Sequence, residues 1–218
     1  MAPSRGRKGT AMTGTRQRII DASATLMRRQ GYEATGMKEI VTAASAPFGS
    51  VYHFFPGGKE QLGAETIRWS GAEYAKLLAA ALDSSPDLAG GVRAFFDGAA
   101  EYLVATGYAD ACPIATIALE VSSHSEVLRQ ACAEVFEMWA NDGARRLEAG
   151  GVPAGAARRL AVEMLALLEG AFVLCRAARD TEALRVAADA ALASLAAALA
   201  PGPGAAAPAP PGSRQEER

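Results

Sequence analysis

The side chains of this sequence that are best suited to recognise another molecule gather in its first 60 residues. They are the hydroxyls of Thr35 and Tyr52, the imidazole of His53 and the ammonium of Lys59. Such groups donate hydrogen bonds to phosphate oxygens, and the free N–H groups at the start of a helix do the same. Side chains of these types are suited to contact with the phosphates and base edges of a nucleic acid.

The sequence contains no comparable set of residues suited to catalysis or to metal binding. The two histidines, His53 and His124, lie far apart, and the sequence has no phosphate-binding loop, dinucleotide glycine pattern or paired-carboxylate motif. Cys112, Cys132 and Cys175 are widely spaced without a CxxC pair, so neither a zinc site nor a disulfide framework is indicated. We therefore expect no enzyme activity, no metal and no cofactor.

The charges are distributed unevenly along the chain. Residues 1–60 hold nine Lys and Arg against four Asp and Glu, whereas residues 61–218 hold thirteen against twenty. This asymmetry predicts that the first segment meets a polyanion and that the rest is an ordinary acidic domain. The N-terminus lacks the apolar stretch of a secretory signal, and no run is apolar enough to span a bilayer. The sequence thus predicts a cytoplasmic protein without a membrane partner.

The elements that would position these side chains are helices. Half of the residues are apolar, only 6% are aromatic and alanine is abundant, which favours close-packed helices and an all-α fold. The expected order is a basic arm over 1–13, a helix-turn-helix domain over 14–58, a ligand-binding and dimerisation domain over 59–200 and a Pro/Ala/Gly tail over 201–218. Both ends are expected to be disordered.

The predicted DNA-binding domain consists of three short helices. Their apolar repeats cover residues 15–30, 37–44 and 48–54. Gly31 ends the first, Thr35 caps the second, and Pro47 takes the first position of the third. Short helices joined by a tight turn form the helix-turn-helix pattern, whose last helix enters the major groove.

The remaining repeats predict a helical bundle. They cover residues 59–82, 87–106, 114–120, 126–149, 156–178 and 181–199. The helix over 156–178 is apolar nearly all round, and the last helix has the apolar spacing of a helix packed along another. We therefore expect a homodimer in which these two helices pair with their two-fold mates. The interface residues would be Leu168, Phe172, Leu184, Ala188, Ala191 and Leu195.

Three runs in the first 60 residues carry a resemblance to a known family. They are RIIDAS at 18–23, GYEAT at 31–35, and GSVYHFFP at 49–56 followed by Lys59 and Glu60. In this order they resemble the N-terminal signature of TetR-family repressors. The runs CPIA at 112–115, EGA at 169–171 and PGGKEQ at 56–61 resemble the drug- and flavonoid-responsive, LmrA/YxaF-like subgroup.

The resemblance implies a dimeric repressor that binds double-stranded operator DNA and is released by a small effector. The DNA-contacting positions that it implies, together with the residues argued above, are Thr15, Arg16, Thr35, Pro47, Phe48, Gly49, Ser50, Tyr52, His53 and Lys59. Phe48 departs from the family, which commonly has lysine there. Phe48 either touches a thymine methyl group or packs on the neighbouring helix.

A ligand pocket between bundle helices would be apolar with a few polar groups. Its expected lining is Phe95, Phe96, Tyr102, Phe136, Trp139, Met164, Glu169 and Phe172. Glu169 stands in an otherwise apolar helix, so it either anchors a ligand or pairs with Arg176. The alternatives to a ligand-responsive repressor are an activator and a redox-sensing regulator without a dedicated ligand.

Overall fold

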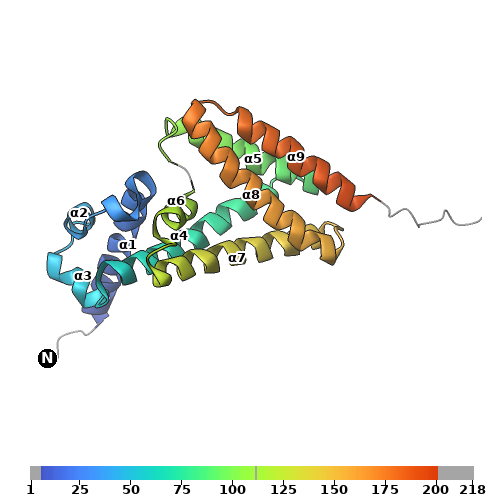
Figure 1. Ribbon diagram of the computed structural model, residues 1–218. Coiled ribbons are helices and arrows are strands. Elements are labelled where there is room, and N and C mark those ends of the chain that lie inside the picture. The colour runs from blue at the N-terminus through green and yellow to red at the C-terminus, as the bar shows by residue number, and fades with distance from the viewer. Residues whose placement is uncertain (1–5, 111, 201–218) are drawn as a thin grey trace, which may run out of the picture.

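The computed structural model of the protein describes residues 6–110 and 112–200, with side chains from residue 14 onward. Every regular element in these residues is a helix, which confirms the predicted all-α fold. The helices are α1 (Gly6–Ala34), α2 (Met37–Ala43), α3 (Phe48–Phe54), α4 (Gly58–Leu82), α5 (Leu88–Ala105), α6 (Pro113–Val121), α7 (Glu126–Ala149), α8 (Ala154–Ala178) and α9 (Glu182–Leu199). Figure 1 shows α1, α2 and α3 at one end of the molecule and α9 reaching the other.

The helix ends lie within two residues of the predicted ones, with α1 as the exception. This helix begins at Gly6, inside the segment expected to be a disordered arm, and it continues past Gly31 to Ala34. Gly31 has φ 84° and ψ 174°, so the helix changes direction there instead of ending. Residues 1–5 and the tail over 201–218 lie outside the described residues.

The first three helices form a small head with a core of its own. Ile19 of α1, Ile40 of α2, and Val51 and Phe55 at α3 are fully buried. Val51 and Phe55 are four residues apart, so they lie on one side of α3. Burial of that side leaves the opposite side of α3 facing outward.

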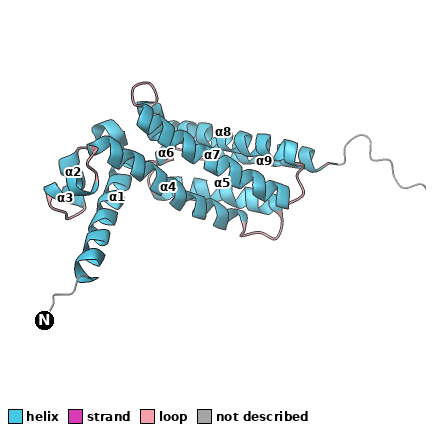
Figure 2. Ribbon diagram, turned by 90° about the horizontal axis from the view of Figure 1, so that it is seen from below, coloured by secondary structure: helices cyan, strands magenta, loops and turns pink. Residues whose placement is uncertain are grey.

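The larger domain is a bundle that α4 connects directly to the head. Helix α4 starts one turn after the head and packs against α7, which packs against α8; α8 packs against α9, and α9 against α5 (Figure 2). Asp87 caps α5 by accepting from Gly90 N, and Ser125 caps α7, as predicted, by accepting from Leu128 N. A displacement of α4 inside the bundle would therefore move the head.

The predicted dimer interface is wrong in its residues. Leu184, Ala188, Ala191 and Leu195 are at most 1% exposed, because α5 and α8 already cover the apolar seam of α9 within one chain. Leu168 and Phe172 of α8 are buried as well. The period of the seam indicated helix packing correctly, but the partner helices belong to the same protomer.

Candidate nucleic-acid interface and effector pocket

The outward side of α3 carries four of the ten predicted DNA-contacting residues together. Phe48 and Tyr52 are both 51% exposed, and their rings lie 5.8 Å apart between centroids. Gly49 and His53 are exposed one position further along, and a Cβ at Gly49 would meet open space. Because these positions repeat at i and i+4, they form one recognition face.

The residues at the edges of this recognition face differ in their exposure to solvent. Pro47 is the exposed N-cap residue of α3, and Ser50 is half-buried at the edge of the face. The half-exposed ring of Phe48 contacts Tyr52 of its own helix. This exposure favours the alternative in which Phe48 reaches a base over the one in which it packs on a neighbouring helix.

Three basic or hydroxyl side chains predicted to reach phosphates are engaged within the protein. Lys59 Nζ lies 4.4 Å from the centroid of the Tyr32 ring and donates to the carbonyl of Glu33 at 3.2 Å. Arg16 pairs with Glu65, and Thr15 Oγ1 accepts from Arg18 Nη2 at 3.1 Å. A phosphate contact from Lys59 or Arg16 would require these pairings to exchange.

The prediction that Thr35 caps α2 is wrong. Its side chain is fully buried, and its hydroxyl donates to the carbonyl of Gly31 at 2.6 Å. Gly36 is the N-cap residue of α2, and it provides no side-chain cap. The hydroxyl of Thr35 therefore stabilises the bend after Gly31 and is shielded from a phosphate.

Lys38, which was not among the DNA-contacting residues expected from the sequence, lies on the surface of α2. It carries no ion pair among the described residues, unlike Arg16. The sequence signal for a DNA contact by Lys38 was that it is the basic residue of the predicted second helix. An exposed ammonium group without an ion pair is suited to a phosphate.

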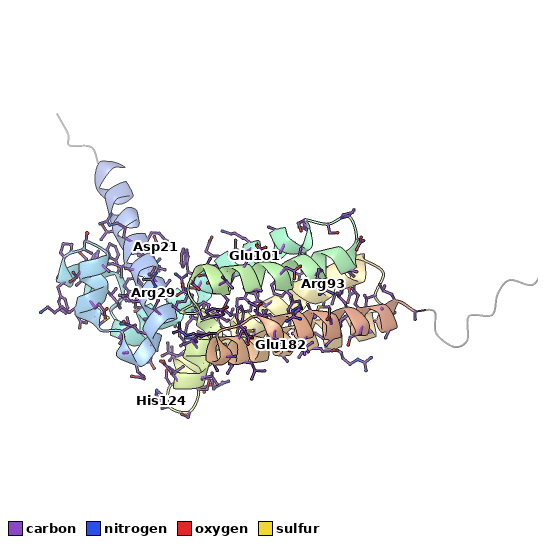
Figure 3. All side chains as sticks on the ribbon, turned by 90° about the horizontal axis from the view of Figure 1, so that it is seen from above. Asp21, Arg29, Arg93, Glu101, His124 and Glu182 are labelled. Carbon is purple, nitrogen blue, oxygen red and sulfur yellow. The ribbon has the colours of Figure 1, made fainter. Side chains whose placement is uncertain are left out.

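Helix α6 joins the head to the bundle through the carboxylate of Glu120. Its Oε2 accepts from Tyr32 N at 2.7 Å and from Glu33 N at 3.1 Å, directly after the bend at Gly31. His124, in the turn that follows α6 (Figure 3), lies 3.0 Å from Glu33 Oε1 through Nε2. The backbone at the bend is thus held by side chains of the larger domain.

A second connection runs through the buried carboxylate of Asp110, in the loop before α6. Its Oδ2 lies 2.8 Å from Arg28 Nε of α1 and accepts from the Tyr102 hydroxyl of α5 at 3.1 Å. Arg29 approaches the other oxygen at 3.7 Å. Burial of Tyr102, followed by the electrostatic effect of Tyr74, raises the pKa of its hydroxyl well above the usual range. Tyr102 therefore acts here as a neutral hydrogen-bond donor.

Replacing Gly31 by alanine should destabilise the junction between head and bundle. The backbone conformation of Gly31 is one that essentially only glycine adopts, and an added Cβ would overlap the Glu120 carboxylate. We expect a loss of about 2–4 kcal/mol in the free energy of unfolding, measured by urea titration.

The matched control is Gly36→Ala, because Gly36 has an ordinary φ of −86° and open space around its Cβ position. It should change stability by less than about 0.5 kcal/mol. Equal stability of the two variants would contradict the assigned role of Gly31.

An apolar slot lies between α4, α5, α7 and α8. Its volume is about 40 Å³, and it is lined by Leu78, Leu82, Leu88, Val92, Phe95, Trp139, Gly143, Arg146, Leu147, Ala161, Met164 and Leu165. Phe95, Trp139 and Met164 are among the predicted pocket residues. The indole N–H of Trp139 donates to the carbonyl of Gly71 at 2.9 Å, so its polar group is satisfied inside the protein.

Five predicted pocket residues lie outside this slot. Phe96 and Phe172 are buried core residues, the ring of Phe136 packs on that of Trp139, and Tyr102 binds Asp110. The leucines of α4 that line the slot were missed because they look like ordinary core positions in the sequence.

Glu169, the fifth of these residues, has a different environment. Its Oε1 is buried and has no hydrogen-bond partner among the described residues. Burial raises the pKa of Glu169 to about 7, although a hydrogen bond with Cys112 opposes the shift. Arg176 does not pair with it, because that guanidinium donates to the carbonyls of Tyr108 and Ala109 at 3.3 Å.

Two structural findings concern the described residues as a group. They contain no set of three or more His, Cys, Asp or Glu side chains arranged to hold a metal ion. None of their helices has both the length and the apolar character needed to cross a bilayer.

The fold and its recognition face define a class of protein, in which a helix-turn-helix DNA-binding domain is joined to a helical regulatory bundle. Residues 19–66 match the family model of bacterial regulatory proteins of the tetR family, and residues 89–190 match the C-terminal domain of LmrA/YxaF-like transcriptional regulators. The chain belongs to the TetR family of transcriptional regulators, which confirms the resemblance seen in its sequence.

Individual relatives agree with this assignment. The regulator YxaF of Bacillus subtilis is 32% identical over 180 residues, which cover 83% of this chain and 94% of YxaF. Regulator Rv0196 of Mycobacterium tuberculosis is 34% identical over 177 residues, covering 78% and 88% of the two chains. A TetR protein of Rhodobacter sphaeroides has a similar structure, with a TM-score of 0.71, 26% identity and coverage of 82% and 97%. These relatives are regulators and not enzymes.

Proposed function

We propose that this TetR-family protein is a cytoplasmic homodimeric repressor that binds a palindromic operator and is released by a small apolar or aromatic effector. The observation that carries the DNA-binding part is the recognition face of α3, where Phe48, Tyr52 and His53 are exposed although Val51 of the same helix is buried in the core of the head. Contact with base edges would explain why apolar and aromatic side chains are exposed on a short helix of a basic head.

The dimer would form through the outward sides of α8 and α9. Val162, Val173 and Leu174 of α8 and Val186 of α9 are 46–62% exposed. Exposed small residues continue the same stripes, at 166, 170 and 177 on α8 and at 190, 193 and 197 on α9. A second copy of the chain, packed helix against helix, would cover this apolar surface. Two recognition helices could then meet successive major grooves, about 34–36 Å apart.

Release of the operator would follow from the size of the slot. A cavity of about 150 Å³ accommodates benzene, whereas the slot measures about 40 Å³. An effector that enters the slot must therefore separate its walls, two of which are Leu78 and Leu82 of α4. Because α4 begins at the head, such a ligand would favour a state in which the spacing of the two heads has changed.

Two of the cysteines argue against the redox alternative. Cys112 and Cys132 are buried, and burial raises the pKa of both thiols, to about 11 for Cys132. The thiolate is the reactive form of cysteine, so these two thiols are poorly placed to react.

The substitution Tyr52→Ala tests the DNA-binding proposal. Operator duplexes selected from a random-sequence pool should bind the wild-type protein, and the variant should lose about 1–3 kcal/mol of affinity for them. The measurement is fluorescence anisotropy of a labelled duplex.

The control for Tyr52→Ala is Leu77→Ala, which removes a side chain that is 65% exposed on α4, outside the head. It should leave operator affinity unchanged. Failure to select any duplex, or equal affinity of both variants, would contradict the proposed recognition face.

A further inference from the structure

Glu169 is a half-buried residue whose carboxyl group has no cationic partner among the described residues. Its Oε1 is buried and unpartnered in the described part of the chain, and no ion pair involves it there. An ionisable group in such a place destabilises the protein unless a partner compensates it. The nearest basic residue along the same helix, Arg176, is occupied by two loop carbonyls.

Among the described residues, the contact of Glu169 with another element is with a neutral thiol. Cys112, the N-cap residue of α6, hydrogen-bonds to it, and burial together with the Glu169 charge raises the pKa of this thiol well above its usual range. The next buried thiol, Cys132 of α7, donates to the carbonyl of Ile114. On α1, Arg28 pairs with Asp110 at 2.8 Å, and the exposed Arg29 lies 3.7 Å from the same carboxylate. Arg146, which lines the slot, pairs with Asp83. The Glu169 end of the proposed site therefore lacks a cation.

The apolar slot comes within one helical turn of this carboxyl group. Leu165, four residues before Glu169 on α8, lines the slot, and so does Met164. Four residues of helix advance by about 6 Å, which a short alkyl chain spans. A molecule with a cationic head at Glu169 could place an apolar body beside these residues.

We infer that the effector is a small organic ammonium ion, in which the ammonium group binds Glu169 and the hydrocarbon part enters the slot beside Leu165. This inference rests on the proposed function as a ligand-released regulator and adds a cationic head group to the apolar effector proposed there. The charge supplies the missing partner of Glu169, and the narrow slot selects a slender apolar body over a bulky one.

The location of Glu169 also connects the ligand to the head. Its neighbour Cys112 caps α6 by accepting from Ala115 N at 3.4 Å. The other end of α6 holds the bend of α1 through Glu120. An ammonium group that draws Glu169 away from Cys112 would loosen the start of α6, and α6 transmits the change to the head.

The test compares three probes of matched length on the full-length protein by calorimetry: n-hexylammonium, 1-hexanol and hexanoate. A charge-assisted hydrogen bond contributes about 1.5–3 kcal/mol, so hexylammonium should bind at least about tenfold more tightly than hexanol, and hexanoate should bind least. Equal binding of the three probes by the wild-type protein, or strongest binding of hexanoate, would overturn the inference without any variant.

The variant Glu169→Gln keeps the shape of the side chain and removes its charge. It should abolish the preference for hexylammonium and leave hexanol binding unchanged. Glu163→Gln is the matched control, because Glu163 is exposed on the same helix and should leave the preference intact. A preference that survives Glu169→Gln would place the ammonium group elsewhere and overturn the assignment.

Operator binding measured in the same samples separates the two proposals. If the wild-type protein binds operator DNA but shows no preference for the ammonium probe, the ligand inference is wrong and the repressor proposal stands. If it binds hexylammonium through Glu169 but no DNA, the repressor proposal is wrong and the assigned ligand site stands.

Discussion

Raising the NaCl concentration from about 50 to about 200 mM should weaken operator binding by about 10³–10⁵-fold, the effect expected when a dimer contacts about 6–10 phosphates. Each head would supply half of these contacts. Residues 1–60 carry nine Lys and Arg, including the exposed Lys38, and this basic surface must displace condensed counterions from the DNA. The salt dependence is measured by anisotropy titrations at five or more NaCl concentrations.

The control is the thermal melting temperature of the free protein over the same salt range. Most of its ion pairs are exposed, such as that between Arg68 and Glu134, so screening them should change stability little. A logarithmic plot of affinity against salt that is flat, while the protein stays folded, would contradict phosphate binding by the head.

Placing two arginines on the outer side of α8, by Val173→Arg with Leu174→Arg, should convert the dimer into monomers. The two side chains are 59% and 62% exposed in one protomer, so the substitutions cost little within the monomer. In the proposed dimer they would bring four like charges into an apolar interface. Separated heads lose the gain from simultaneous binding of two half-sites, so operator affinity should fall by about 10²–10⁴-fold.

Sedimentation velocity and anisotropy together check this result. Leu77→Arg is the control, because it introduces arginine at a side chain that is 65% exposed on α4, away from the proposed interface. It should remain dimeric with normal operator affinity. Persistence of the dimer in the double variant would place the interface on another surface. The buried Leu184 and Leu195 are unsuitable for this test, because arginine there would disrupt the monomer.

Local sequence signals determined the helices and the recognition face of this protein. The turn signal at Pro47 predicted α3 over the same residues that the structure shows, and the family resemblance marked Phe48 and Tyr52, which are exposed, as positions facing DNA. The Ser125 cap is equally local, since a hydroxyl three residues ahead of Leu128 N is within reach in any helix start. These features depend on neighbours along the chain, which the sequence contains.

Tertiary structure alone decided which partner covers each apolar or polar group. The seam of α9 has the same period whether its partner is α5 of one chain or a second copy, so the sequence could not distinguish core from interface. Gly31 looked like a helix end until Glu120, 89 residues later, supplied the acceptor that holds its bend. The lack of a cation for Glu169 likewise follows from where Arg176, on the same helix, finds its acceptors. The apolar period of a helix indicates which side chains are buried. Which residues cover them depends on contacts between segments that are distant in sequence.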